Sequence, residues 1–178
     1  ISGVGQGSGT RNFSATGLEG TYGLYLDADT SNKLYVRNHT PFASSGAIVT
    51  LSFRMYVDSL NVTEYVYYNV ATLESSGGQW LGAVYISGKE GESGIYYWAT
   101  GCGSAPPPLS TTTLAGDTEY CVWLEYTAGT GSNAACTLYV ATPTKGTCSK
   151  PSATQTIPDG VSTGTAAYVG LWATYNNP

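Results

Sequence analysis

Residues 49–57 indicate the fold class most clearly, and they read Val49-Thr50-Leu51-Ser52-Phe53-Arg54-Met55-Tyr56-Val57. Every odd-numbered residue of this stretch is apolar, whereas the even-numbered residues are polar or amphipathic. Successive side chains of a β-strand point to opposite faces, so this alternation predicts a strand that buries one face only. The apolar row should face a core, and Arg54 and Tyr56 should lie on the opposite, outer face.

A second stretch with the same period is residues 120–126, which read Tyr-Cys-Val-Trp-Leu-Glu-Tyr. Val122 and Leu124 are predicted to point inward. The outer row of this strand is then predicted to contain Cys121, Trp123 and Glu125. A loop rich in Gly, Ser and Asn follows, and it predicts a hairpin that leads into a strand at residues 135–141.

Strand patterns recur along the chain, and no stretch shows the 3.6-residue period of a helix. The two stretches above belong to predicted strands at residues 47–59 and 118–126. The remaining predicted strands are residues 20–26, 33–38, 64–74, 80–87, 94–99 and 166–174. Short strands separated by turn residues predict an all-β fold, an antiparallel two-sheet β-sandwich or jelly roll. We expect one domain over residues 20–178 after a flexible N-terminal arm, residues 1–19. Two long loops are also expected: residues 104–113, which contain three consecutive prolines, and residues 143–160.

The composition excludes several classes of protein. Only 11% of the 178 residues are charged and 12% are aromatic, whereas disordered chains have many charges and few aromatics. Seven basic residues against twelve acidic ones argue against a nucleic-acid partner. The sequence has no run of about 20 apolar residues, so it predicts no membrane-spanning helix. These features together predict a compact extracellular β protein.

The four cysteines Cys102, Cys121, Cys136 and Cys148 predict two disulfides. Their spacing contains no Cys-x-x-Cys pair of the kind that a zinc site uses. Of the three connectivities that four cysteines allow, Cys102–Cys121 with Cys136–Cys148 is preferred, because Cys121 and Cys136 are predicted to face opposite ways on neighbouring strands.

Three segments match the acceptor pattern for N-glycosylation, at Asn12, Asn38 and Asn61. Such matches also arise by chance in a chain rich in Ser and Thr. Together with the disulfides they favour a secreted or cell-surface protein, and we expect a mature segment whose signal peptide has been removed.

The aromatic residues carry the clearest functional pattern. Fifteen Tyr and four Trp against three Phe favour rings with a polar edge, which suit half-wet surfaces such as glycan-binding platforms. Burial of these rings under a second layer is the alternative. If the strands are neighbours in one sheet, the predicted ligand-binding residues on its outer face are Arg54, Tyr56, Trp123 and Glu125, with Trp98 added from another strand.

Catalysis has little support in the sequence. A glycosidase needs two carboxyl groups about 5–9.5 Å apart, whereas Glu119 and Glu125 would be roughly 20 Å apart along one strand. Glu64 and Glu74 flank one predicted strand and are too far apart for the same reason. The only histidine, His39, lies in a turn-like stretch with no nucleophile motif, so no catalytic residues are assigned.

Several short motifs resemble those of a known family: V-T-L-S-F-R-M-Y-V-D-S at 49–59, V-A-T-L at 70–73, T-E-Y-C-V-W-L-E-Y-T-A-G-T at 118–130 and T-L-Y-V-A at 137–141. In their order they resemble the concanavalin A-like jelly roll, in its laminin-G and carbohydrate-binding-module branches, over residues 20–175. Two departures occur. Glu119 stands where the family usually has an aromatic residue, and the family's closing strand is missing after residues 166–174.

The resemblance implies glycan binding without catalysis and no cofactor other than a structural Ca²⁺. Asp27 and Asp29, two positions apart, loosely match such a site and supply the oxygen ligands that Ca²⁺ prefers. A polar turn, in which Asp and Asn bond the local backbone, is the alternative.

Two further functions stay open. The chain could be a structural subunit of an extracellular filament or surface layer, self-associating into polymers when the N-terminal arm of one copy completes the sheet of the next. The third is a secreted glycan-active enzyme.

Overall fold

The computed structural model describes residues 3–6, 9–14, 23–28, 33–38, 48–57, 67–103, 108–130, 133–160 and 164–174. All regular elements in these ranges are strands: β1 (Gly3–Gln6), β2 (Gly9–Ser14), β3 (Gly23–Ala28), β4 (Lys33–Asn38), β5 (Ile48–Val57), β6 (Tyr68–Ser75), β7 (Trp80–Gly88), β8 (Tyr96–Gly101), β9 (Leu109–Leu114), β10 (Thr118–Thr127), β11 (Ala134–Ala141), β12 (Gln155–Gly160) and β13 (Ala166–Thr174).

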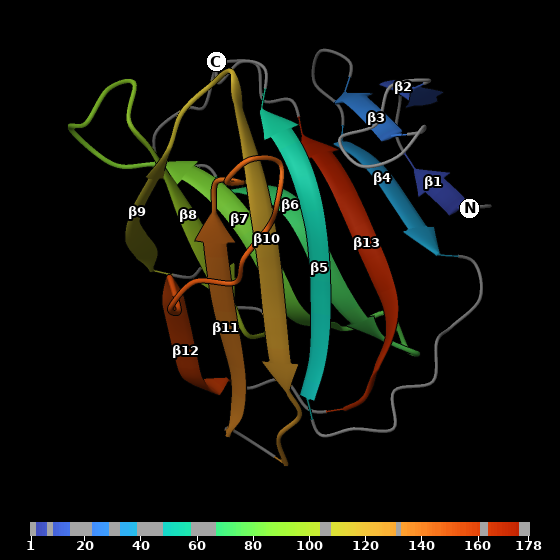
Figure 1. Cartoon of the computed structure of the whole chain (residues 1–178). Coiled ribbons are helices and arrows are strands. Elements are labelled where there is room, and N and C mark those ends of the chain that lie inside the picture. The colour runs from blue at the N-terminus through green and yellow to red at the C-terminus, as the bar shows by residue number, and fades with distance from the viewer. Residues whose placement is uncertain are drawn as a thin grey trace.

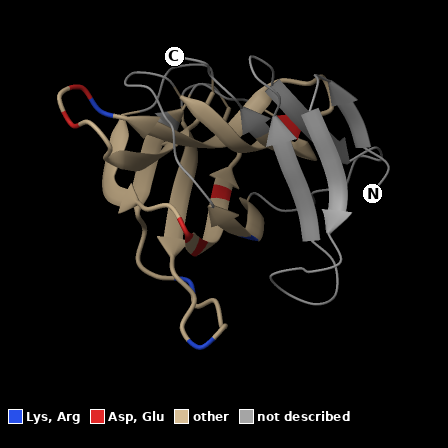
Figure 2. Cartoon of the chain, turned by 90° about the horizontal axis from the view of Figure 1, so that it is seen from above, with Lys and Arg blue, Asp and Glu red and all other residues tan. Residues whose placement is uncertain are grey.

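Two antiparallel sheets pack face to face and form a β-sandwich (Figures 1 and 2), which confirms the predicted fold class. The larger sheet has seven strands in the order β1-β4-β13-β6-β7-β8-β9, and the smaller has four in the order β12-β11-β10-β5. Strands β2 and β3 form a separate pair. In sandwiches of this kind the two packed sheets usually keep their mean strand directions within about 30° of each other.

The core lies between the two sheets and follows the predicted alternation. Val122, Leu124 and Leu138 are fully buried, and the odd-numbered residues of β5 pack against the same cluster. Strands β6 and β7 are buried on both faces over most of their length. They therefore lack the alternation seen in β5, β10 and β11, because neither of their faces needs to be polar.

Strands β9 and β12 lie where long loops are expected from the sequence. Each is at an edge of its sheet, and each has few apolar residues: Leu-Ser-Thr-Thr-Thr-Leu in β9 and Gln-Thr-Ile-Pro-Asp-Gly in β12. A proline such as Pro158 is tolerated at an edge because it need not donate to a ladder on both sides.

Strand β13, the predicted strand at residues 166–174, lies inside the larger sheet. It pairs with β4 on one side and β6 on the other, so it does not itself form an open edge. Within the predicted arm, residues 1–19, β1 pairs with β4 and β2 pairs with β3 of the same chain.

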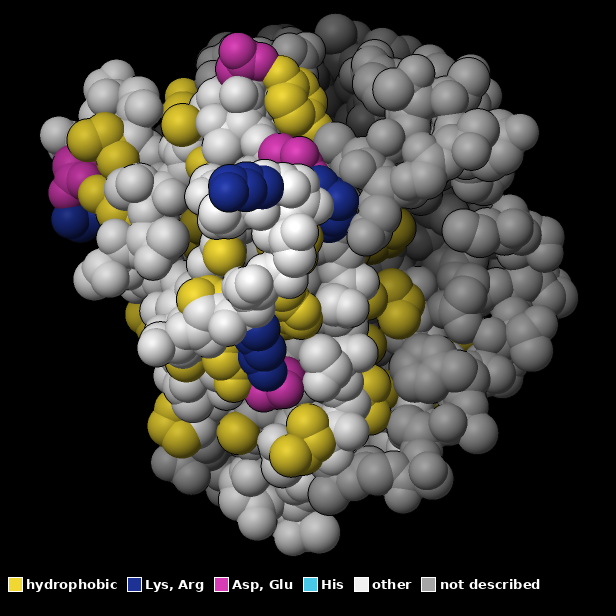
Figure 3. All heavy atoms as spheres, viewed as in Figure 1, with side chains coloured by type: hydrophobic (Ala, Val, Ile, Leu, Met, Phe, Trp, Pro, Cys, Tyr) yellow, Lys and Arg dark blue, Asp and Glu magenta, His cyan; other side chains and the backbone are white. Residues whose placement is uncertain are grey.

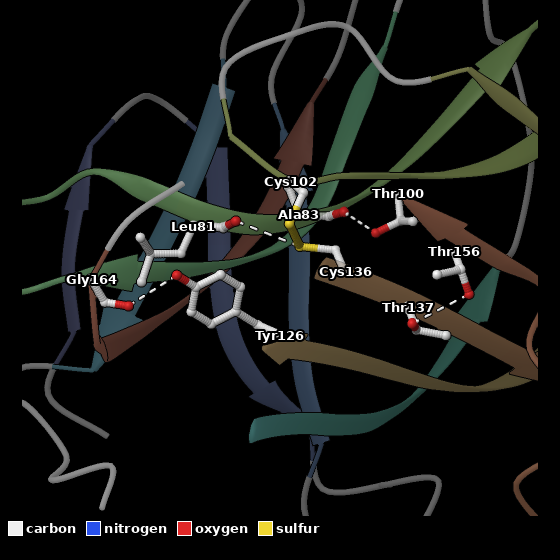
Figure 4. The surroundings of a disulfide bond; sticks show 9 residues. All are labelled: Leu81, Ala83, Thr100, Cys102, Tyr126, Cys136, Thr137, Thr156 and Gly164. Atoms are coloured by element: carbon white, nitrogen blue, oxygen red, sulfur yellow. Dashed lines mark hydrogen bonds between the residues drawn. A yellow bond between two sulfur atoms is a disulfide. The ribbon is translucent and has the colours of Figure 1, made fainter. Parts of the chain in front are cut away.

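One side of the sandwich is closed by covalent and polar links between the sheets. The disulfide Cys102–Cys136 joins the segment after β8 to β11 inside the core (Figure 4). Beside it the side-chain amide of Gln155 accepts a hydrogen bond from the Thr100 N–H (2.7 Å) and donates one to the Pro108 carbonyl (2.7 Å). Gln155 thus satisfies backbone groups of the opposite sheet, as a strand neighbour would.

Candidate functional site

The outer face of the four-stranded sheet brings together four of the five predicted ligand-binding residues. Trp123 of β10 has Ser52 of β5 and Tyr139 of β11 as register partners, and Glu125 has Thr50 of β5 as one of its own. Register partners point to the same side of a sheet. Arg54, Tyr56, Trp123 and Glu125 therefore share one face, as predicted from the alternation.

Trp98 is not part of this face, and its prediction as an exposed platform is wrong. Its side chain is fully buried between the sheets, where its ring lies edge-on to that of Tyr120 with the centroids 5.4 Å apart. The neighbouring Tyr97, on the other face of β8, is partly exposed. From the sequence alone either residue could have faced the core.

A segment between β11 and β12, residues 142–154 and here called the flap, crosses the outer face in front of β10 and β11 (Figure 1). Its tip is the tight turn Thr144–Thr147, in which Lys145 (φ 52°) and Gly146 (φ 74°) have left-handed backbone conformations. Two such residues in a row are typical of a type I′ hairpin turn. The pair Lys-Gly between two threonines is the one sequence pattern that could have indicated this turn.

Covalent and hydrogen bonds hold the flap on the sheet. The disulfide Cys121–Cys148 joins it to the outer face of β10, with the Cα atoms 5.8 Å apart. At its far end the Thr154 N–H donates to the Leu138 carbonyl (2.8 Å), and the Val140 N–H donates to Thr154 Oγ1 (2.9 Å).

The observed disulfides, Cys102–Cys136 and Cys121–Cys148, contradict the preferred pairing but confirm the predicted facing. Cys136 points into the core, where the end of β8 brings Cys102 against it. Cys121 lies on the outer face, where the flap brings Cys148. A disulfide needs Cα atoms within about 7 Å, so each cysteine bonds the partner that lies on its own side of the sheet.

Two charged clusters flank Trp123 on this face. Glu125 accepts hydrogen bonds from Lys150 Nζ of the flap (2.6 Å), from the Tyr139 hydroxyl (2.8 Å) and from Thr50 Oγ1 (3.4 Å). Lys150 also lies over the Tyr139 ring, 3.8 Å from its centroid, in a cation–π contact. The hydrogen bond from Lys150, with a smaller contribution from Tyr139, holds the pKa of Glu125 below its ordinary value, whereas the bond to Glu125 raises the pKa of Tyr139.

The second cluster lies nearer the other end of β10. Arg54 donates from Nε to Glu119 (2.6 Å) and forms an ion pair with it, and the Tyr56 hydroxyl bonds Asp117. The space-filling view in Figure 3 shows hydrophobic side chains lying between pairs of opposite charge on this face. The face therefore offers a ring surface with polar groups on both sides whose orientations are already fixed.

The described residues give no support to a metal site. Asp27 lies in β3 opposite Thr10, and Asp29 lies outside the described ranges. Within those ranges no group of three or more His, Cys, Asp or Glu residues could hold an ion. Because Asp29 lies outside the described ranges, the Ca²⁺ site that the resemblance implies stays a prediction.

The predicted glycosylation sites fall mostly on strands. Asn12 lies in β2 and Asn38 ends β4, whereas Asn61 is outside the part of the chain that the structure describes. Their modification stays a prediction.

No helix of the described residues is long and apolar enough to cross a membrane. The two disulfides are compatible with an extracellular protein. No protein-family model, curated protein or solved structure matches the chain. The two-sheet sandwich is therefore established from the structure itself, and it does not single out one jelly-roll family.

Proposed function

We propose that the chain is a non-catalytic glycan-binding module that acts outside the cytosol, and that the outer face of the four-stranded sheet is its binding surface. The observation that carries this proposal is the row Ser52–Trp123–Tyr139, in which a partly exposed indole has a hydroxyl neighbour on each side. Sugars present an apolar face of C–H groups and a rim of hydroxyls, so they suit an aromatic surface surrounded by polar groups.

The charged clusters support the same proposal. Glu125 and Arg54 each have a fixed partner, so a ligand would meet donors and acceptors that need little reordering. The flap makes one wall of this surface because Lys150 reaches from it to Glu125.

The two other functions have less support. A filament subunit assembled by its N-terminal arm would need that arm to be available, whereas β1 pairs with β4 of its own chain. For a glycan-active enzyme, the two carboxylates of this face that lie on β10, Glu119 and Glu125, are six residues apart on one strand, about 20 Å. That separation is too large for either hydrolytic geometry.

A glycan array on the purified chain tests the proposal, followed by titration of any ligand with the Trp123→Ala variant. We expect this variant to weaken binding by more than about 1 kcal/mol through lost ring stacking, with almost no change in melting temperature. The matched control is Ile95→Ala, which removes an exposed apolar side chain from the β7–β8 hairpin. An array without any bound glycan, or equal binding by both variants, would contradict the proposal.

A further inference from the structure

Strand β5 is an edge strand without the usual protection against pairing with another chain. It pairs with β10 along its whole length without a bulge, and no strand of the described ranges pairs with its other side. Natural edge strands are commonly short, kinked by a bulge or interrupted by Pro or Lys. β5 has ten residues and no proline, and Arg54 is its single charged residue.

The same edge is rich in apolar surface. The inward-facing residues Val49, Leu51, Phe53 and Met55 pack on the core yet are only partly buried. Ile48 is 59% exposed and Tyr56 is 49% exposed, and they are two of the three large hydrophobic side chains found exposed among the described residues. A sheet edge at which no described strand pairs, beside half-covered apolar side chains, favours addition of a strand.

We propose that this edge binds β5 of a second copy of the chain, antiparallel and about a two-fold axis at Ser52. The two four-stranded sheets then become one continuous sheet. In an antiparallel pair, residues directly opposite each other point their side chains to the same face of the sheet. Each odd-numbered residue of one β5 must therefore lie opposite an odd-numbered residue of the other, so that core-facing side chains meet core-facing side chains. With the axis at Ser52, Leu51 meets Phe53, Val49 meets Met55, and Ile48 meets Tyr56 of the second copy.

The occupant is a second copy because the edge is complementary to itself in this register. Both strongly exposed apolar side chains cover each other, and Arg54 of one copy meets Thr50 of the other. Thr50 Oγ1 donates to Glu125, so the guanidinium approaches the side of the sheet where that carboxylate lies. An axis at Arg54 would instead set two guanidiniums opposite each other, which is unfavourable.

The register has a consequence for the outer face. Trp123 is the register partner of Ser52, so the axis at Ser52 places the Trp123 rings of both copies in one row. Three strand spacings separate them, about 14 Å. A long glycan could then contact both rings, and this consequence rests on the proposed function, whereas the dimer does not.

Sedimentation equilibrium of the full chain tests the dimer. We expect a concentration-dependent dimer for the wild type and a dissociation constant at least about tenfold higher for Ser52→Lys and for Ser52→Glu alone, because like charges meet at the axis. Mixing these two variants should restore dimerisation, which a folding defect could not do. Ser52 is exposed, so Ser52→Thr serves as the conservative control and should dimerise like the wild type.

A wild type that stays monomeric up to its solubility limit would overturn the proposal, as would a Lys–Glu mixture that fails to associate. The register is tested separately with Ser52→Cys and Thr50→Cys under oxidised glutathione. The Cys at position 52 should form a disulfide-linked dimer because it meets itself, whereas the Cys at position 50 meets Arg54 and should not. Efficient cross-linking at position 50 alone would exclude the axis at Ser52.

Discussion

Strands β10 and β11 present two faces that differ in packing, polarity and chemistry. Toward the core, Val122, Leu124 and Leu138 are fully buried among apolar neighbours. On the outer face, Trp123 and Glu125 are partly exposed, and hydrogen bonds rather than close packing fix the carboxylate. Each face also has its own disulfide. Because neighbouring residues point to opposite faces, one strand can supply both a core and a candidate binding surface.

The largest expected effect that would test this difference is at Trp98, on the core side. We expect Trp98→Ala to lower the free energy of unfolding by about 3–5 kcal/mol, because removing a fully buried indole leaves a cavity. Denaturant unfolding measures this value. Trp98→Phe should cost much less, since it also removes an indole N–H that is buried and has no hydrogen-bond partner. A cost for Trp98→Ala as small as that of Trp123→Ala would show that the two faces do not differ in packing.

The two disulfides give the next largest effect. Their sequence separations are similar, 34 and 27 residues, so loop-closure entropy alone predicts a loss of about 3.5–4 kcal/mol when either pair is replaced by Ala. We expect the Cys102/Cys136 double variant to lose more than the Cys121/Cys148 variant, because it also leaves a cavity in the core. Thermal and denaturant unfolding of both variants provide the comparison. Equal losses would mean that chain entropy alone accounts for both bonds.

The smallest effect is expected at Glu125 and depends on pH. Its pKa is lower in the folded chain than the ordinary 4.5, so its stabilisation is complete above pH 4.5 and is lost as the pH falls through the folded value. We expect Glu125→Gln to cost less than about 1 kcal/mol near pH 7, because the pair is partly exposed, and nothing well below the folded pKa. Urea unfolding from pH 7 to pH 3 measures this difference. Glu90→Gln, on the exposed β7–β8 hairpin, is the control, and a cost at Glu125 that does not change with pH would contradict the assignment.

The sequence predicts those strands that have one buried face and one solvent-exposed face. In β5, β10 and β11 strict alternation reveals both the strand and the direction of each side chain, so Arg54, Tyr56, Trp123 and Glu125 are placed correctly on one face. In β6, β7 and β8 the pattern is lost because both faces are largely covered, and Trp98 is misplaced for that reason. The edge strands β9 and β12 are missed because they bury little apolar surface.

The partners across the sandwich could not be predicted from local pattern. The parity that separates Cys121 from Cys136 is visible in the sequence, but the approach of Cys102 to Cys136 depends on how the two sheets stack. Likewise Lys150 reaches Glu125 because the flap, which follows β11 in sequence, lies back over β10, where its disulfide joins it. Contacts of this kind depend on tertiary packing rather than on the period of one strand.

The position of β13 has a consequence for the order in which the chain folds. This strand lies between β4 and β6, which it joins into one sheet, although it follows the other described strands in sequence. During synthesis the β4 and β6 segments are therefore made long before the strand that separates them, and each has an unpaired edge until residues 166–174 are complete. Such long-range pairing slows folding and leaves edges open to wrong partners. Completing this sheet thus requires residues 166–174 to pair in its middle rather than at its edge.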